Sequence, residues 1–315
     1  MTDTNKPKMG ELFGGESSGG FLGMATAPPG EVGESRVVLM GAPCATPYVS
    51  VGPYCASAPK AVRNAFGWPG VLEHHDFDLG GTVLADAGHA LDWGDLPWSA
   101  SDFESNRRVI REHVEQVLAA GAKPIVIGGD DSIPVPVLEA YEDSGPVSIL
   151  QLDAHIDWRD EVGGERYGLS SNMRRASEMT WVENITQIGA RGLGSARPND
   201  VQDALDWGVH LLPMEAVVND GMAAVLDNIP RGARLFINLD IDVMDPAVVP
   251  AVIGPAPGGF QYWQMIRLLK AVAERADIVG FCLTELMPAN DVGGRGALVA
   301  ARLVTLVLSL LRQSR

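Results

Sequence analysis

The chain has 315 residues, enough for one large α/β domain or two small ones. Its formal net charge is −16 and no basic cluster offsets it, so nucleic acid and anionic membrane surfaces are excluded as partners and a cationic ligand is favoured. The three cysteines, Cys44, Cys55 and Cys282, lack metal-ligand spacing and cannot all pair, and no secretory signal precedes them. We therefore expect a reduced, cytoplasmic protein.

Residues 1–34 are rich in Gly, Ser and Pro without periodicity, which predicts a flexible N-terminal arm before a catalytic domain over residues 35–315. Ser101 and Glu104 have the spacing of a capping box and predict a helix that ends near Gly121. Further helices are expected at about 133–142, 215–228, 260–275 and 296–312. Short apolar runs predict strands at 37–40, 124–127, 147–152, 185–188, 210–212, 235–239 and 278–284.

This alternation of strands and helices predicts a single three-layer α/β/α domain with a mostly parallel central sheet. The last apolar stretch, 297–311, is too short to span a bilayer comfortably and reads as a buried helix. In open sheets of this class, ligands bind at the carboxyl ends of the strands.

Two acidic runs follow such strands. Asp153, His155 and Asp157 come after the run 147–152, and Asp240 and Asp242 come after 235–239. Side chains on an extended chain alternate between faces, so the members of each run share one side. Four carboxylates and an imidazole are costly to bury unless cations neutralise them, so the runs predict a site with more than one metal ion.

Three motifs occur in a characteristic order: Gly-Gly-Asp-Asp-Ser (128–132), Asp-Ala-His-Ile-Asp (153–157) and Asp-Ile-Asp-Val-Met-Asp-Pro (240–246). With an N-terminal stretch over 41–63, they resemble the ureohydrolase family of arginases and agmatinases, in particular its agmatinase-like branch. The resemblance implies an arginase-like fold, assembly as trimers or hexamers, and two divalent ions. Manganese is the expected ion because hard oxygen ligands with one imidazole suit it, and nickel is the alternative.

The resemblance also assigns roles to residues. Asp153 and Asp240 would bridge the two ions. The remaining ligands would be Asp131 and Asp157 for the first ion, and His155 and Asp242 for the second. Glu285 would bind the guanidinium of the substrate and act with Asp157 as a catalytic residue, while Asp130 would support the ligands from outside.

Two positions depart from the family pattern. Asp131 stands where the family usually has a histidine, and as an alternative it caps a helix that starts near Ile133. Leu169 stands where a family loop carries a histidine that shuttles protons or contacts substrate, and an aliphatic side chain cannot transfer a proton.

The sequence therefore favours a hydrolase that cleaves a guanidino C–N bond to release urea and an amine, as an agmatinase does. The first alternative is a relative that acts on guanidine, a guanidino acid or a biguanide, with nickel in place of manganese. The second is a non-catalytic subunit of a hetero-oligomer, whereas the favoured form is a homo-oligomer. We expect specificity to reside in loops near 44–56, 159–172 and 289–295.

Overall fold

The computed structural model describes residues 19–66, 72, 74–83, 89–194 and 196–313. Nine strands of the described residues form one sheet in the order β1-β5-β2-β6-β11-β10-β7-β8-β9, and every neighbouring pair is parallel. The strands are β1 (Ala25–Thr26), β2 (Val37–Ala42), β5 (Ala90–Asp95), β6 (Lys123–Gly128), β7 (Val147–Leu152), β8 (Val182–Ile188), β9 (His210–Leu212), β10 (Arg234–Asp240) and β11 (Asp277–Thr284). A separate antiparallel pair joins β3 (His75–Asp76) to β4 (Gly81–Thr82).

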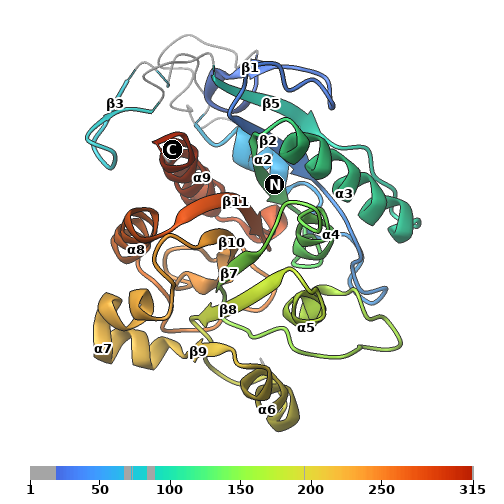
Figure 1. The fold of residues 1–315 in the computed structure, drawn as a ribbon, viewed down its shortest axis with the longest axis vertical. Helices are drawn as coiled ribbons and strands as arrows, with labels where there is room; N and C mark the ends of the chain where they lie inside the picture. Colours follow the sequence, from blue (N-terminus) through green and yellow to red (C-terminus); the bar gives the residue numbers. More distant parts are fainter. Residues whose placement is uncertain (1–18, 67–71, 73, 84–88, 195, 314–315) are drawn as a thin grey trace.

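Helices cover both faces of the sheet (Figure 1). One layer comprises α2 (Ala58–Arg63), α7 (Met214–Asp227), α8 (Tyr262–Arg275) and α9 (Arg295–Gln313). The other comprises α3 (Phe103–Ala119), α4 (Pro134–Glu139), α5 (Asn172–Ser177) and α6 (Pro198–Trp207). The remaining short 3₁₀ turns are η1 (Phe21–Gly23), η4 (Leu169–Ser171), η5 (Ile241–Val243) and η6 (Pro288–Asn290). The predicted three-layer α/β/α fold is confirmed.

Each central strand supplies side chains to both layers. On β7, Leu150 and Leu152 pack against one layer, whereas Ile149 packs against the other. Because both faces are covered, all six residues of β7 are buried and the strand lacks polar alternation. The core therefore consists of two apolar layers, one on each face of the sheet. Polar functional side chains are accommodated at the ends of the strands.

The seven predicted strands and five predicted helices all exist. The ranges 147–152 and 210–212 match β7 and β9 at both ends, and the other elements have shifted ends. Among the described helices and strands, the sequence missed β1, β3, β4, β5, α2, α5 and α6. The capping-box prediction is wrong in detail, because Asp102 is the N-cap of α3 and its carboxylate accepts from the Ser105 amide at 3.0 Å. A helix therefore starts one residue later than the Ser101 pattern indicates.

The predicted N-terminal arm lies partly within the described residues. Phe21 is fully buried, and its amide donates to the Asp92 carboxylate at 2.7 Å. Residues 1–18 lie outside the described part, and the domain boundary at residue 34 stays a prediction.

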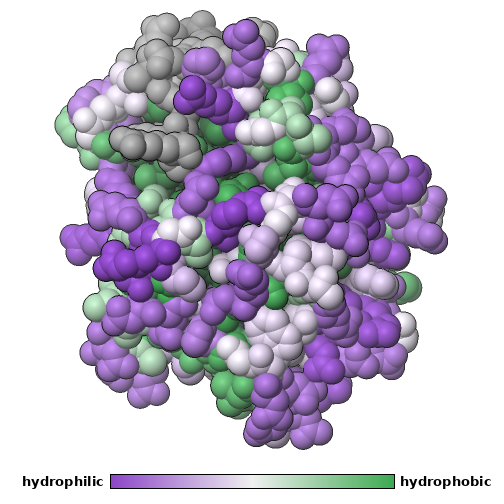
Figure 2. Space-filling model, in the orientation of Figure 1, coloured by the Kyte–Doolittle hydropathy of each residue, from purple (hydrophilic) through white to green (hydrophobic). Residues whose placement is uncertain are grey.

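Hydrophilic residues cover most of the face in Figure 2, and the hydrophobic ones are scattered in small areas. Among the described helices, none combines the length and the apolar character that a bilayer crossing requires.

Candidate metal centre

Four adjacent strands deliver the acidic side chains to one edge of the sheet. The four strands are neighbours in the order β6-β11-β10-β7. Asp131 lies three residues after the end of β6, and Glu285 follows β11 directly. Asp240 is the last residue of β10, and Asp153 follows β7 directly. Since the strands are parallel, their carboxyl ends meet at the same edge. The tertiary structure thus brings together residues that lie up to about 150 positions apart in the chain.

Six of the eight predicted site residues line a common pocket of about 190 Å³, and the other two, Asp130 and Asp153, do not line it. Its lining includes Asp131, His155, Asp157, Asp240, Asp242 and Glu285. A larger hollow of about 690 Å³ lies at the opposite, amino-terminal edge of the sheet and is lined by none of these six. The smaller pocket therefore holds the chemistry that the motifs predict.

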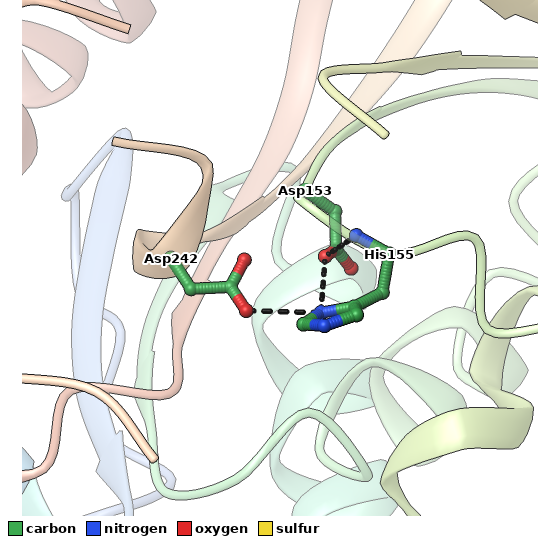
Figure 3. Close-up of side chains that lie close together, drawn as sticks. All are labelled: Asp153, His155 and Asp242. Carbon is green, nitrogen blue, oxygen red and sulfur yellow. Dashed lines mark hydrogen bonds and ion pairs between the residues drawn. The ribbon is translucent and has the colours of Figure 1, made fainter. Parts of the chain in front are cut away.

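Two groups of ligand atoms lie within this cluster and share one residue. In the first, shown in Figure 3, the His155 Nδ1 atom is 2.9 Å from an oxygen of Asp242 and 3.3 Å from an oxygen of Asp153. In the second, oxygens of Asp131, Asp153 and Asp240 all lie within 4.8 Å of one another. Asp153 belongs to both groups, as expected of a residue that contacts two metal ions.

Asp157 stands beside these groups. Its carboxylate accepts from the Gln151 amide at 3.1 Å and from the Asn172 amide at 3.3 Å. Its backbone has a φ of 50°, and Glu285 has a φ of 66°. Non-glycine residues rarely adopt such angles, and strained residues of this kind cluster at functional sites.

The cluster holds more negative charge than the protein neutralises by itself. Burial, and after it the charge of neighbouring carboxylates, raises the pKa of Asp131, Asp157, Asp240 and Glu285 well above the usual value. The same causes raise the pKa of Asp153 to about 7. These carboxyl groups cannot all ionise together unless positive charge is added.

His155 supplies one such charge. Burial by itself would lower the pKa of the imidazole, but its hydrogen bonds to Asp153 and Asp242 dominate and raise it to about 12. The Nδ1–H group of the protonated imidazole therefore lies between the carboxylates of Asp153 and Asp242 and supplies positive charge to both. The donor set, hard oxygens with one imidazole around an anionic hollow, fits divalent ions.

Asp131 does not cap the following helix, so that alternative is wrong: the N-cap position of α4 is Ile133. The Asp131 carboxylate instead accepts from the Thr284 hydroxyl and from the side-chain amides of Asn172 and Asn238. These neutral donors support the carboxylate where the family usually has an imidazole. Metal binding by Asp131 stays a prediction.

Asp130 is also buried, and its Oδ1 atom accepts from the Ser132 amide at 3.0 Å. Its other oxygen has no hydrogen-bond partner among the described residues. Asp130 belongs to neither of the two candidate ligand groups, and its supporting role stays a prediction.

Tyr54 is a site residue that the sequence did not reveal. Its hydroxyl donates to both oxygens of Glu285, at 2.8 and 2.7 Å. Burial, followed by the charge of Glu285, raises the pKa of the phenol, so the group stays protonated. Tyr54 lies 231 positions from Glu285 in an irregular loop, and no local pattern links the two.

The loops predicted to hold specificity contribute unequally. Arg159, Leu169 and Ser170 line the pocket, so the stretch 159–172 reaches it. Ile253 and Gly254 line it as well, whereas no residue of 289–295 does within the described chain. Leu169 thus places an apolar surface at the pocket.

Comparison with known proteins identifies the family. A family model described as "Arginase family" matches residues 35–309. The chain belongs to the arginase family. It is 32% identical over 274 residues to N(1)-aminopropylagmatine ureohydrolase of Thermus thermophilus, covering 86% of this chain and 88% of that protein. It is 33% identical to guanidinopropionase of Pseudomonas aeruginosa, over 71% of each chain.

Solved structures agree with the fold. Proclavaminate amidino hydrolase from Streptomyces clavuligerus superposes with a TM-score of 0.81 at 25% identity, covering 94% of this chain and 97% of the other. The arginase family uses a dinuclear divalent-metal centre, and the two groups that share Asp153 are candidate ligands for it.

Proposed function

We propose that this chain is an agmatinase-like ureohydrolase that uses two manganese ions to release urea from a cationic guanidino compound. The observation that supports it best is the pair of ligand groups that share Asp153, whose other four members line one pocket with Glu285. Family membership supports the reaction class, and the relatives named above act on guanidino compounds by their names.

In this proposal two ions would be held by Asp131 and Asp157 on one side and by His155 and Asp242 on the other, and both ligand sets would share Asp153 and Asp240. Such a pair of ions supplies a water nucleophile of lowered pKa for attack on a trigonal carbon. The oxygen-rich donor set favours manganese over copper, with nickel as the alternative.

The protein itself orients the substrate. Glu285 is buried at the pocket, and a carboxylate there accepts two parallel N–H bonds from a planar guanidinium. The net charge of −16 attracts such a cation toward the site. Leu169 cannot move a proton, so the leaving amine would have to take its proton from water or from another group.

Two observations favour a second candidate, a non-catalytic subunit of a hetero-oligomer. Asp131 replaces the usual histidine, and Leu169 removes the usual proton carrier. We place the catalytic role first because four of the other five predicted ligands line the pocket with Glu285, and the fifth, Asp153, belongs to both candidate ligand groups. We further propose a cytoplasmic homo-oligomer, trimeric or hexameric, in keeping with the family.

A coupled measurement tests the proposal. Protein prepared with manganese or nickel is assayed for bound metal and for urea release from agmatine, N(1)-aminopropylagmatine, 3-guanidinopropionate, guanidine and a biguanide. We expect two ions per chain and the fastest release from agmatine or N(1)-aminopropylagmatine. Asp242→Asn should lower metal content, whereas Glu285→Gln should keep both ions and lose activity by at least a hundredfold.

Two ions per chain with no urea from any substrate would refute the catalytic role and favour the subunit role. Fastest release from guanidine, the guanidino acid or the biguanide would replace the agmatinase-like assignment by the first alternative.

A further inference from the structure

Three side chains behind the pocket form a continuous line of hydrogen bonds that ends on two predicted metal ligands. The Trp158 indole N–H donates to Gln187 Oε1 at 2.8 Å, and Gln187 Nε2 donates to Gln151 Oε1. Gln151 Nε2 then donates to Asp153 at 2.7 Å and to Asp157 at 3.1 Å. The three side chains are 0–2% exposed and line no part of the pocket.

The chemistry of the side chains determines which group donates and which accepts at each of these hydrogen bonds. An indole nitrogen only donates, so the oxygen of Gln187 must face Trp158 and its NH₂ group must face Gln151. The oxygen of Gln151 is then held by Gln187, and its NH₂ group points at the two carboxylates. Trp158, together with the Ile156 carbonyl that also accepts from Gln187 Nε2, thereby fixes the orientation of the Gln187 amide, and through it that of the Gln151 amide.

The same residues hold the backbone around Asp157. Gln187 Nε2 also donates to the carbonyl of Ile156 at 2.7 Å, directly before Asp157, while Trp158 follows directly after it. The Arg174 amide donates to the Asp157 carbonyl at 3.2 Å. The left-handed backbone of Asp157 is unfavourable for an L-residue, so it persists only where the surroundings enforce it.

We propose that Gln187, acting through Gln151 and together with Trp158, is a positioning residue that sets Asp153 and Asp157 for cation binding. The neutral NH₂ group of Gln151 bridges two carboxylates that repel each other, which holds both in place and leaves their remaining lone pairs for an ion. This inference rests on the proposed metal centre, and it adds residues that never touch the ion or the substrate.

The test uses two neighbouring residues of β8. Gln187→Met keeps the length of the side chain and removes the three hydrogen bonds that Gln187 makes, with Trp158, with Gln151 and with the Ile156 carbonyl. Thr186→Val is the matched control, because Thr186 is equally buried and its hydroxyl donates to the Asn228 carbonyl at 3.0 Å, away from the site. Manganese titration by calorimetry and metal content after dialysis are measured on each metal-free protein, together with its melting temperature.

We expect Gln187→Met to bind one of its two ions at least tenfold more weakly than the wild type, as loss of ligand-orienting partners does. Thr186→Val should bind both ions as the wild type does. Trp158→Phe removes the indole donor together with part of the buried ring, and it leaves Gln187 and Gln151 in place. It should give a smaller loss in the same direction, which keeps the test valid if Gln187→Met fails to fold.

A folded Gln187→Met protein with two ions at wild-type affinity would overturn the inference, and so would equal losses in both β8 variants. If Gln187→Met does not fold, wild-type affinity in Trp158→Phe overturns it. A wild type that binds two ions but releases no urea refutes the proposed activity alone, because none of these titrations depends on turnover.

Discussion

Single side chains decide how strongly the pocket holds a substrate. The Tyr54 hydroxyl is nearly equidistant from both oxygens of Glu285, so it occupies the edge of the carboxylate that a planar guanidinium would use. The Asp131 amide takes a further position on Oε1 at 2.9 Å. A substrate that pairs with Glu285 must therefore displace Tyr54 or share the carboxylate with it.

Tyr54→Phe removes this competitor and should lower the KM of the preferred guanidino substrate roughly fivefold, which corresponds to about 1 kcal/mol for one hydrogen bond. Tyr48→Phe is the control, because the Tyr48 hydroxyl contacts the Ser170 amide at 3.3 Å rather than Glu285. Steady-state kinetics on both variants decide the matter. A higher KM in Tyr54→Phe would mean that the hydroxyl supports Glu285 instead of competing for it.

At the scale of elements, the strands were more predictable than the helix ends. The buried central strands are short runs of mostly β-favouring apolar residues, so the local sequence predicts where they lie. The short helices α2 and α5 have six residues each and depend on contacts with α9 and α4. A six-residue helix is too short to be stable by its own propensity, so these contacts are what stabilise both helices.

The start of α3 offers a test at this scale. Asp102→Ala removes the side-chain cap and should lower the free energy of unfolding by about 1 kcal/mol. Ser101→Ala, at the position that the sequence pattern favoured, should change it by less than about 0.5 kcal/mol. Denaturant unfolding of both metal-loaded variants measures the difference, and a larger loss in Ser101→Ala would restore the capping-box interpretation.

At the scale of the whole molecule, the buried carboxylates at the pocket repel one another, and bound cations would reduce that repulsion. The raised pKa values mean that the folded, metal-free chain keeps protons that the unfolded chain releases as the pH rises above about 4. His155 also lowers the stability of the metal-free fold above about pH 6.5. Its pKa is raised to about 12, so the folded chain keeps a proton that the unfolded chain has already released. Both effects make the metal-free fold less stable as pH increases.

We therefore expect the melting temperature of the metal-free protein to fall by several degrees between pH 5 and pH 8. Saturating manganese should raise the melting temperature, with a larger effect at pH 8 than at pH 5. Calorimetric scans in chelator and in manganese at both pH values test this. A metal-free melting temperature that rises over this interval would show that the cluster is not under charge strain.

The sequence by itself determined the layered α/β class, the central strands and the acidic motifs that follow them, because strand periodicity and motif spacing are local properties. It also anticipated that the motifs meet, since parallel strands end at one edge. Only the tertiary structure decided that Tyr54 binds Glu285 and that three neutral donors surround Asp131. Only the tertiary structure, too, placed Gln187 and Trp158 behind Asp157. Those contacts join residues from separate elements through buried hydrogen bonds, and such partners are chosen by packing in three dimensions rather than by any pattern along the chain.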